Sequence, residues 1–296
     1  MTVQATTSQR LIKPRTQRAK RALEVRASKL IENPKRTLYV RGGRTSETVT
    51  KLLKELYQLH KPHGILLNRK NPIHPFDDDT FLEQMCAKYD ASLFAFVSHS
   101  KKRPNNLIIG RMYDFHVFDM VEFGVENFKS MDQFKTPKVA VGLKPCLLFA
   151  GASFQCDATY ERIQNLFIDH FRLEQVEQLC LQGVQEAIAF TAVDDVIQMR
   201  VYRILLKKSG GHTPRAELVE IGPQCDLRVR RTKLASEDLR KLALKQPTTT
   251  KPKSVKNVSK DVFGTTLGRV HVGKQSLRGL QTRKMAAFKK RRPNDA

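Results

Sequence analysis

The strongest constraint on the fold is an order of elements that occurs twice, with the second start 109 residues after the first, at Cys146 against Thr37. Residues 37–43 (TLYVRGG) predict a short strand that ends in a glycine turn, and apolar spacing over 49–59 predicts a helix behind it. Residues 146–151 (CLLFAG) repeat the strand and turn, and Asp157 can cap a second helix. This repetition predicts an α/β-layered body of two related halves with a cleft between them.

The spacing of apolar residues and the positions of turn residues predict further helices and strands. Thr80 and Glu83 have the spacing of a capping box at the start of a helix, and Ser236 can cap a last helix. No element is assigned between residues 111 and 145. Strands are expected at 65–67, 92–97, 107–110, 186–193, 196–206, 216–221 and 226–231.

Positive charge is concentrated at the two ends of the chain. Residues 1–36 hold 10 Lys and Arg against 2 Asp and Glu, and residues 241–296 hold 15 against 2, of a net charge of +24. We therefore divide the chain into a basic N-terminal arm (1–36), a body (37–240, halves about 37–135 and 138–240) and a basic tail (241–296). Basic arms on a nearly neutral body favour phosphate contacts that depend on salt. Solubility or nuclear import is the alternative reading.

Two basic segments of the body are candidates for contacts with phosphates. Residues 101–103 form a charged loop between two expected strands, for which a solvated loop is the favoured reading unless RNA lies nearby. In Asp226–Arg231 a period of two places Leu227 and Val229 on one face and Arg228 and Arg230 on the other. Two arginines on one exposed face can bind adjacent phosphates, although a solvated strand face is an equal alternative.

The sequence contains no P-loop or dinucleotide-binding motif and no nucleophile that can be paired with a base. Five single cysteines suggest reduced core thiols, the longest apolar run is too short for a membrane span, and no signal-peptide core is seen, so we expect a soluble, non-secreted chain. Asp77–Asp79 could hold a metal, and His60 with His63 a zinc ion, but caps and loop residues are the favoured readings. Gly42-Gly43 could cradle a phosphate, although a plain turn is favoured.

Several segments resemble the Brix-domain family of ribosome assembly factors. Residues 103–111 (RPNNLIIGR) resemble its central signature, and residues 217–223 (ELVEIGP) with 226–231 resemble its C-terminal one. In the tail, KN at 256–257, DVFG at 261–264, GRVH at 268–271 and LQTRKM at 280–285 resemble the extension of one member. The resemblance implies that each half of the body is similar to an anticodon-binding domain.

The resemblance also implies a function and partners. It implies a non-enzymatic factor of the nucleus and nucleolus that pairs with the regulator of ribosome synthesis protein. The pair would bring 5S rRNA and its two ribosomal proteins to large-subunit pre-rRNA in pre-60S particles. No catalytic residue, cofactor, metal or membrane contact is expected.

We weigh three hypotheses: an RNA-binding assembly factor, a nuclear protein-interaction scaffold without direct RNA binding, and a metal-dependent nuclease using Asp77–Asp79. The first is favoured. Its candidate RNA-binding residues are basic positions of the loop, the strands and the tail: Lys101, Lys102, Arg103, Arg111, Arg228, Arg230, Arg231, Lys233, Arg269, His271, Lys274, Arg283 and Lys284.

Overall fold

The computed structural model describes residues 15–26, 32–174, 176, 179–211, 213–245 and 256–274. The chain divides into two compact units, residues 1–246 and 247–296. The first unit holds the body and the helix α1 (Gln17–Arg26). Its boundary falls behind the last helix, α6 (Glu237–Ala243), so this helix belongs to the first unit as a whole.

The first half of the body is a five-stranded layer with two helices. The parallel strands β2, β1 and β3 lie side by side, and the antiparallel strands β4 and β5 continue the layer. The elements in chain order are β1 (Thr37–Gly42), α2 (Glu47–His60), β2 (Gly64–Asn71), α3 (Thr80–Tyr89), β3 (Leu93–Ser98), β4 (Asn106–Tyr113), β5 (His116–Lys129) and the 3-10 turn Met131–Gln133.

The second half repeats the order of the central strands of the first, without counterparts of β2 and α3 among its described residues. Its strand β6 pairs parallel with β7, and β8 and β10 continue antiparallel, as β1, β3, β4 and β5 do in the first half. The elements in chain order are β6 (Cys146–Ala150), α4 (Ser153–Cys156), α5 (Ala158–Phe171), the 3-10 turn Leu181–Gly183, β7 (Glu186–Val193), β8 (Val196–Lys207), β9 (Arg215–Glu220), β10 (Gln224–Lys233) and α6.

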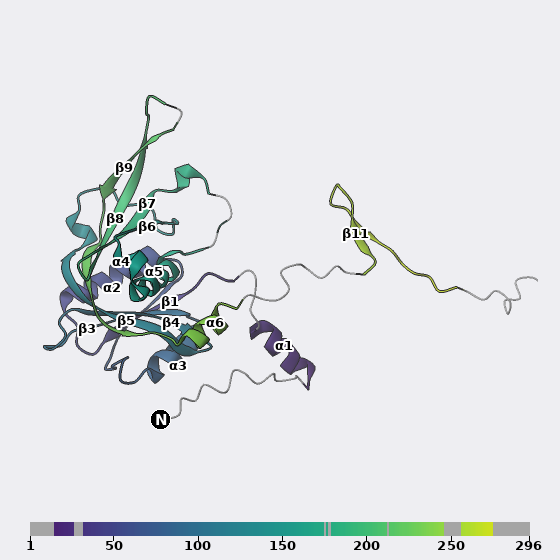
Figure 1. The fold of residues 1–296 in the computed structure, drawn as a ribbon, viewed down its shortest axis with the longest axis horizontal. Helices are drawn as coiled ribbons and strands as arrows, with labels where there is room; N and C mark the ends of the chain where they lie inside the picture. The colour runs from purple at the N-terminus through teal and green to yellow at the C-terminus, as the bar shows by residue number, and fades with distance from the viewer. Residues whose placement is uncertain are drawn as a thin grey trace, which may run out of the picture. The chain divides into compact units, whose positions relative to one another are not determined.

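The two halves form one continuous sheet, because β5 pairs antiparallel with β10 in the order β2-β1-β3-β4-β5-β10-β8-β7-β6. The predicted duplication is therefore confirmed, and the sheet is mixed. The halves also share a core, since α2 and α5 cover the same face of the sheet (Figure 1). Phe123 of β5, Phe167 of α5 and Phe190 of β7 stack there, with ring centroids 5.6 Å and 4.6 Å apart.

The opposite face, which we call the α3 face, differs between the halves. In the first half, Leu82 and Cys86 of α3 are buried against β1, β3, β4 and β5. In the second half no described helix lies on this face. Apolar side chains of its strands are consequently 42–50% exposed there, namely Leu148, Val193, Leu206 and Leu218. We call these four residues the open apolar surface.

Some local predictions were wrong. Strand β5 was missed altogether, although it lies at the centre of the sheet. The capping box is absent: Asp79 is the N-cap residue of α3, and the Glu83 carboxylate accepts from the backbone N–H of Val117 instead. Cys156 and Cys180 are exposed and not core thiols, whereas burial raises the pKa of Cys86 to about 12.

Candidate nucleic-acid interface

The two basic segments of the body lie next to each other. Arg230 donates one hydrogen bond to the carbonyl of Pro104 (2.9 Å) and another to Oδ1 of Asn106 (3.3 Å), so β10 is tied to the loop between β3 and β4. Seven of the candidate residues therefore form one surface, which we call the basic surface: Lys101, Lys102, Arg103, Arg228, Arg230, Arg231 and Lys233.

A bulge in β10 brings three arginines to one face of the sheet. Val229 pairs with Phe123 and Arg231 with Glu122, so Arg230 is the extra residue of the bulge. The three guanidinium groups then follow alternate residues of β5, with Arg228 on Glu126, Arg230 over Gly124 and Arg231 on Glu122. The predicted alternation is correct up to Arg230, and the bulge adds Arg231 to the same face.

The centre of the basic surface is a buried carboxylate. The side chain of Glu122 has no exposed area, and it accepts from Arg103 Nη1 (3.3 Å) and from Arg231 Nε. A buried charge needs such partners, because its desolvation costs several kcal/mol. Two cations share one anion here, and the side chains of Arg103 and Arg231 remain 42% and 37% exposed. One positive charge is thus left over for a ligand.

The remaining cations of the basic surface differ in how freely they can reach a ligand. Lys101 and Lys102 are exposed and make no ion pair with any residue in the described part of the chain. Arg228 pairs with Glu126 at 3.1 Å, both largely exposed, and Lys233 pairs with Asp79 at 2.8 Å. Exposed pairs of this kind are worth about 0–1 kcal/mol, so a phosphate can replace the carboxylate at small cost.

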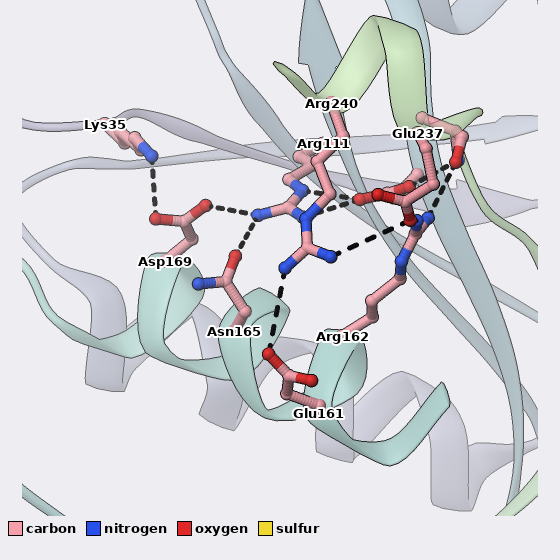
Figure 2. Close-up of polar contacts among 10 residues, drawn as sticks. Lys35, Arg111, Glu161, Arg162, Asn165, Asp169, Glu237 and Arg240 are labelled. Atoms are coloured by element: carbon pink, nitrogen blue, oxygen red, sulfur yellow. Dashed lines mark hydrogen bonds and ion pairs between the residues drawn. The ribbon is translucent and has the colours of Figure 1, made fainter. Parts of the chain in front are cut away.

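Arg111 lies in a different environment, between the two halves (Figure 2). Its guanidinium donates to Oδ2 of Asp119 (2.9 and 2.6 Å), Oδ1 of Asn165 (2.6 Å) and Oδ2 of Asp169 (2.8 Å). Lys35 adds a 2.7 Å contact to Asp169. Only 13% of the Arg111 side chain is exposed. The contacts give Arg111 a structural task, which is to hold β4 and β5 against α5.

Neighbouring contacts in Figure 2 attach α6 to α5. Arg162 of α5 donates to the carbonyl of Ala235 (2.7 Å) and pairs with Glu237. Arg240 lies 3.8 Å from both Glu161 and Glu237. A cavity of about 690 Å³ adjoins this network and is lined by residues of both halves. It is the nearest counterpart of the cleft expected from the sequence.

The candidate residues of the tail belong to the second unit. Strands β11 (Val258–Lys260) and β12 (Thr266–Gly268) form a small hairpin there. The backbone N–H of Arg269 donates to the carbonyl of Asn257 (2.7 Å), and the His271 ring contacts the Asn257 side chain (3.0 Å). Lys274 is exposed behind them. Arg283 and Lys284 lie outside the described residues.

The alternative sites have other roles in the structure. Asp78 accepts from the backbone N–H of Thr80 (3.0 Å), and Asp79 pairs with Lys233. His60 is buried and contacts Thr37 Oγ1 (3.1 Å), and burial lowers its pKa to about 4. In the described part of the chain, no group of three or more His, Cys, Asp and Glu residues could hold a metal ion. No helix among the same residues is long and apolar enough to cross a membrane.

Comparison with known proteins identifies the family. The Brix-domain model matches residues 42–231, which is more than half of the chain. The chain belongs to the Brix-domain family, a family of ribosome biogenesis factors and not of enzymes. This confirms the resemblance found in residues 103–111 and 217–231.

Curated relatives specify the branch of the family. The chain is 53% identical to "Ribosome production factor 2 homolog" of Homo sapiens over 88% of this chain and 86% of the relative. It is 46% identical to the protein of that name in Drosophila melanogaster (95% and 88%) and 40% identical to "Ribosome biogenesis protein RPF2" of Saccharomyces cerevisiae (95% and 85%). A role in ribosome biogenesis follows from these relationships.

Proposed function

We propose that this protein is a large-subunit assembly factor of the nucleus and nucleolus that binds rRNA directly. In this proposal it acts as a heterodimer with the regulator of ribosome synthesis protein and recruits 5S rRNA with its two ribosomal proteins into pre-60S particles. The observation that carries RNA binding is the basic surface, where two segments over a hundred residues apart form one group of seven cations. The net charge of +24 also favours binding to a polyanion such as RNA.

The contacts are proposed to divide into two kinds. Lys101, Lys102, Arg228 and Lys233 are the exposed cations of the basic surface and would bind phosphates, while Arg103 and Arg231 would be held in place by Glu122. The tail, with Arg269, His271, Lys274, Arg283 and Lys284, would add affinity without reading sequence, because phosphate contacts carry no sequence information. Arg111 would act through the fold only.

The heterodimer partner is proposed to bind the open apolar surface and the free edge of β6. In the first half, β2 lines the outer edge of β1 and α3 covers the sheet. In the second half β6 is the outermost strand, and the described residues between α5 and β7 supply neither a strand nor an α-helix. A partner that adds a strand and an amphipathic helix would complete the second half. Unpaired edges and exposed apolar patches are typical of such interaction sites.

RNA binding can be tested with the purified heterodimer. We expect the chain to bind single-stranded and structured rRNA fragments, with an affinity that falls as salt rises. Deletion of residues 247–296 should weaken binding and flatten the salt dependence, since each phosphate contact contributes about −0.7 to −0.9 to the slope of log K against log salt. An unchanged slope would rule out the tail as an RNA arm. Absence of RNA binding by the heterodimer would favour the scaffold hypothesis.

A further inference from the structure

A cavity of about 340 Å³ opens beside the basic surface, at the ends of the parallel strands β1 and β3. Ligands of open α/β sheets commonly bind outside the carboxyl ends of parallel strands. The volume lies within the range of about 300–1,000 Å³ found for small-ligand sites. The sequence showed no sign of this cavity, because its lining comes from segments at 43–44, 72–77 and 96–108 together with Glu122 and Arg231.

The wall of the cavity is an aromatic ring stacked with a guanidinium group. Arg231 Cζ lies 4.2 Å from the ring centroid of Phe76, and both residues line the cavity. An ion pair with the buried Glu122 carboxylate fixes the position of Arg231. Aromatic rings and guanidinium planes are the two surfaces on which proteins stack unpaired bases of RNA.

The buried lining of the cavity is partly apolar, and exposed cations lie at its edge. Phe96 and Ile108, which are 1% and 2% exposed, line it together with the buried side chains of Asn106 and Glu122. At the edge lie Arg103 and the exposed Arg44, which makes no ion pair with the described residues. The apolar side chains suit the flat face of a base, whereas a phosphate at the same depth would lose its hydration beside the Glu122 carboxylate.

We propose that this cavity holds one unstacked base of single-stranded RNA, packed against Phe76 and Arg231, with its flanking phosphates on Arg44, Lys101 and Lys102. The inference rests on the proposed RNA binding and specifies the part of the RNA that the body would recognise. The β3–β4 loop then contributes to shape-selective binding of unpaired nucleotides, in addition to its charge.

The test measures the contribution of a base separately from that of its phosphate. Short single-stranded RNAs of mixed sequence, each with one abasic position, are titrated against the chain in complex with its partner. We expect one or two abasic positions to weaken binding about tenfold, because stacking of one base is worth about 1–3 kcal/mol. In Phe76→Leu the intact and abasic RNAs should bind equally well. In the control Phe115→Leu, which changes a half-exposed ring outside this cavity, the tenfold difference should remain.

A second measurement locates the base. RNA carrying 5-iodouridine at the sensitive position should form a photo-crosslink on the peptide that contains Phe76, as identified by mass spectrometry. If the RNA binds but no abasic position weakens binding, the cavity proposal is wrong and the proposed function stands. If the complex binds no RNA, both are wrong. Loss of stability in Phe76→Leu would not affect this decision, because the abasic series is also measured on the unaltered chain.

Discussion

The two halves of the body have the same order of central strands but differ in how many faces of their sheet are covered by helices. The first half has a helix on each face of its sheet, with α2 on one side and α3 on the other. The second half has α5 on the shared side, and its α3 face stays exposed at Leu148, Leu206 and Leu218. One half thus covers both faces of its sheet, while the other half leaves apolar side chains exposed on one face.

The shared face explains why the second half remains folded without that cover. Its strands and α5 pack into the same core as α2, through Phe123, Phe167 and Phe190. Burial of each such ring stabilises the fold by about 1.5–3 kcal/mol. The β5–β10 pairing adds backbone hydrogen bonds across the junction. We therefore expect the two halves to unfold together.

The largest expected effect comes from Arg111→Ala. The substitution leaves the carboxylates of Asp119 and Asp169 without their shared partner, and Asp119 is 2% exposed. Breaking a buried ion pair costs about 3–5 kcal/mol of the free energy of unfolding. Chemical denaturation should show this loss in a single transition, because the halves still share one core and the β5–β10 pairing. Two separate transitions would show that the halves unfold independently.

A pair of leucine substitutions compares the covered and the open parts of the α3 face. Leu82→Ala, beneath α3, should cost about 2–5 kcal/mol, because Leu82 is fully buried. Leu148→Ala, at 42% exposure, should change the stability of the isolated chain by about 0.5 kcal/mol or less. Titration calorimetry should show weaker partner binding for Leu148→Ala. Equal costs for both variants would mean that the open apolar surface is covered by the chain itself.

The histidine pair between α2 and α5 should make the junction sensitive to acid. Burial lowers the pKa of His60 to about 4 and that of His170 well below its usual value, and their rings lie 5.5 Å apart. Each histidine therefore contributes stability that is complete above pH about 6.5 and is lost as pH falls below it, for His60 down to pH about 4. His60→Gln removes one titrating group. The loss of unfolding free energy between pH 7 and pH 5 should then be about 2 kcal/mol smaller than in the unaltered chain.

Glu186 in the second half provides a control with the opposite sign. Burial raises the pKa of its carboxyl to about 7. The proton is bound more tightly in the folded state, so this contribution is complete below pH about 4.5 and is lost as pH rises through 7. In Glu186→Gln, acidification from pH 7 to pH 5 should therefore destabilise the protein more than it destabilises the unaltered chain. The same pH dependence in both variants would contradict the assignment of these groups.

The smallest effect on stability is expected for Arg228→Ala. Arg228 pairs with Glu126, and both side chains are about half exposed, so the free energy of unfolding should change by about 0.5 kcal/mol or less. RNA binding should weaken a few-fold, and the salt slope should fall by about 0.7–0.9. Arg230→Ala is the matched comparison: it removes contacts to Pro104 and Asn106 and should also reduce stability. An unchanged salt slope in Arg228→Ala would remove Arg228 from the proposed interface.

The sequence predicted best those strands and helices whose apolar residues recur at the spacing of one buried face. Residues 37–42 and 146–150 form β1 and β6, and the helices with inward Leu53 and Phe167 form as expected. Strand β5 was missed because Asp119 and Glu122 interrupt its apolar run. Both carboxylates are buried, and partners that the fold supplies make that burial possible: Arg111 of β4 and the backbone of Ala235 for Asp119, and Arg103 and Arg231 for Glu122. A local pattern cannot reveal partners that the fold supplies.

The candidate site shows the same division. The sequence by itself determined that two segments, 101–103 and 228–233, are basic and that Arg228 and Arg230 alternate with Leu227 and Val229. Only the tertiary structure placed the segments side by side, by means of the bulge at Arg230 and the shared Glu122. It also separated Arg111, which holds the halves together, from the cations that face solvent. The physical reason is that charge and period are properties of the chain, whereas the availability of a charge depends on which neighbours the fold brings within hydrogen-bonding distance.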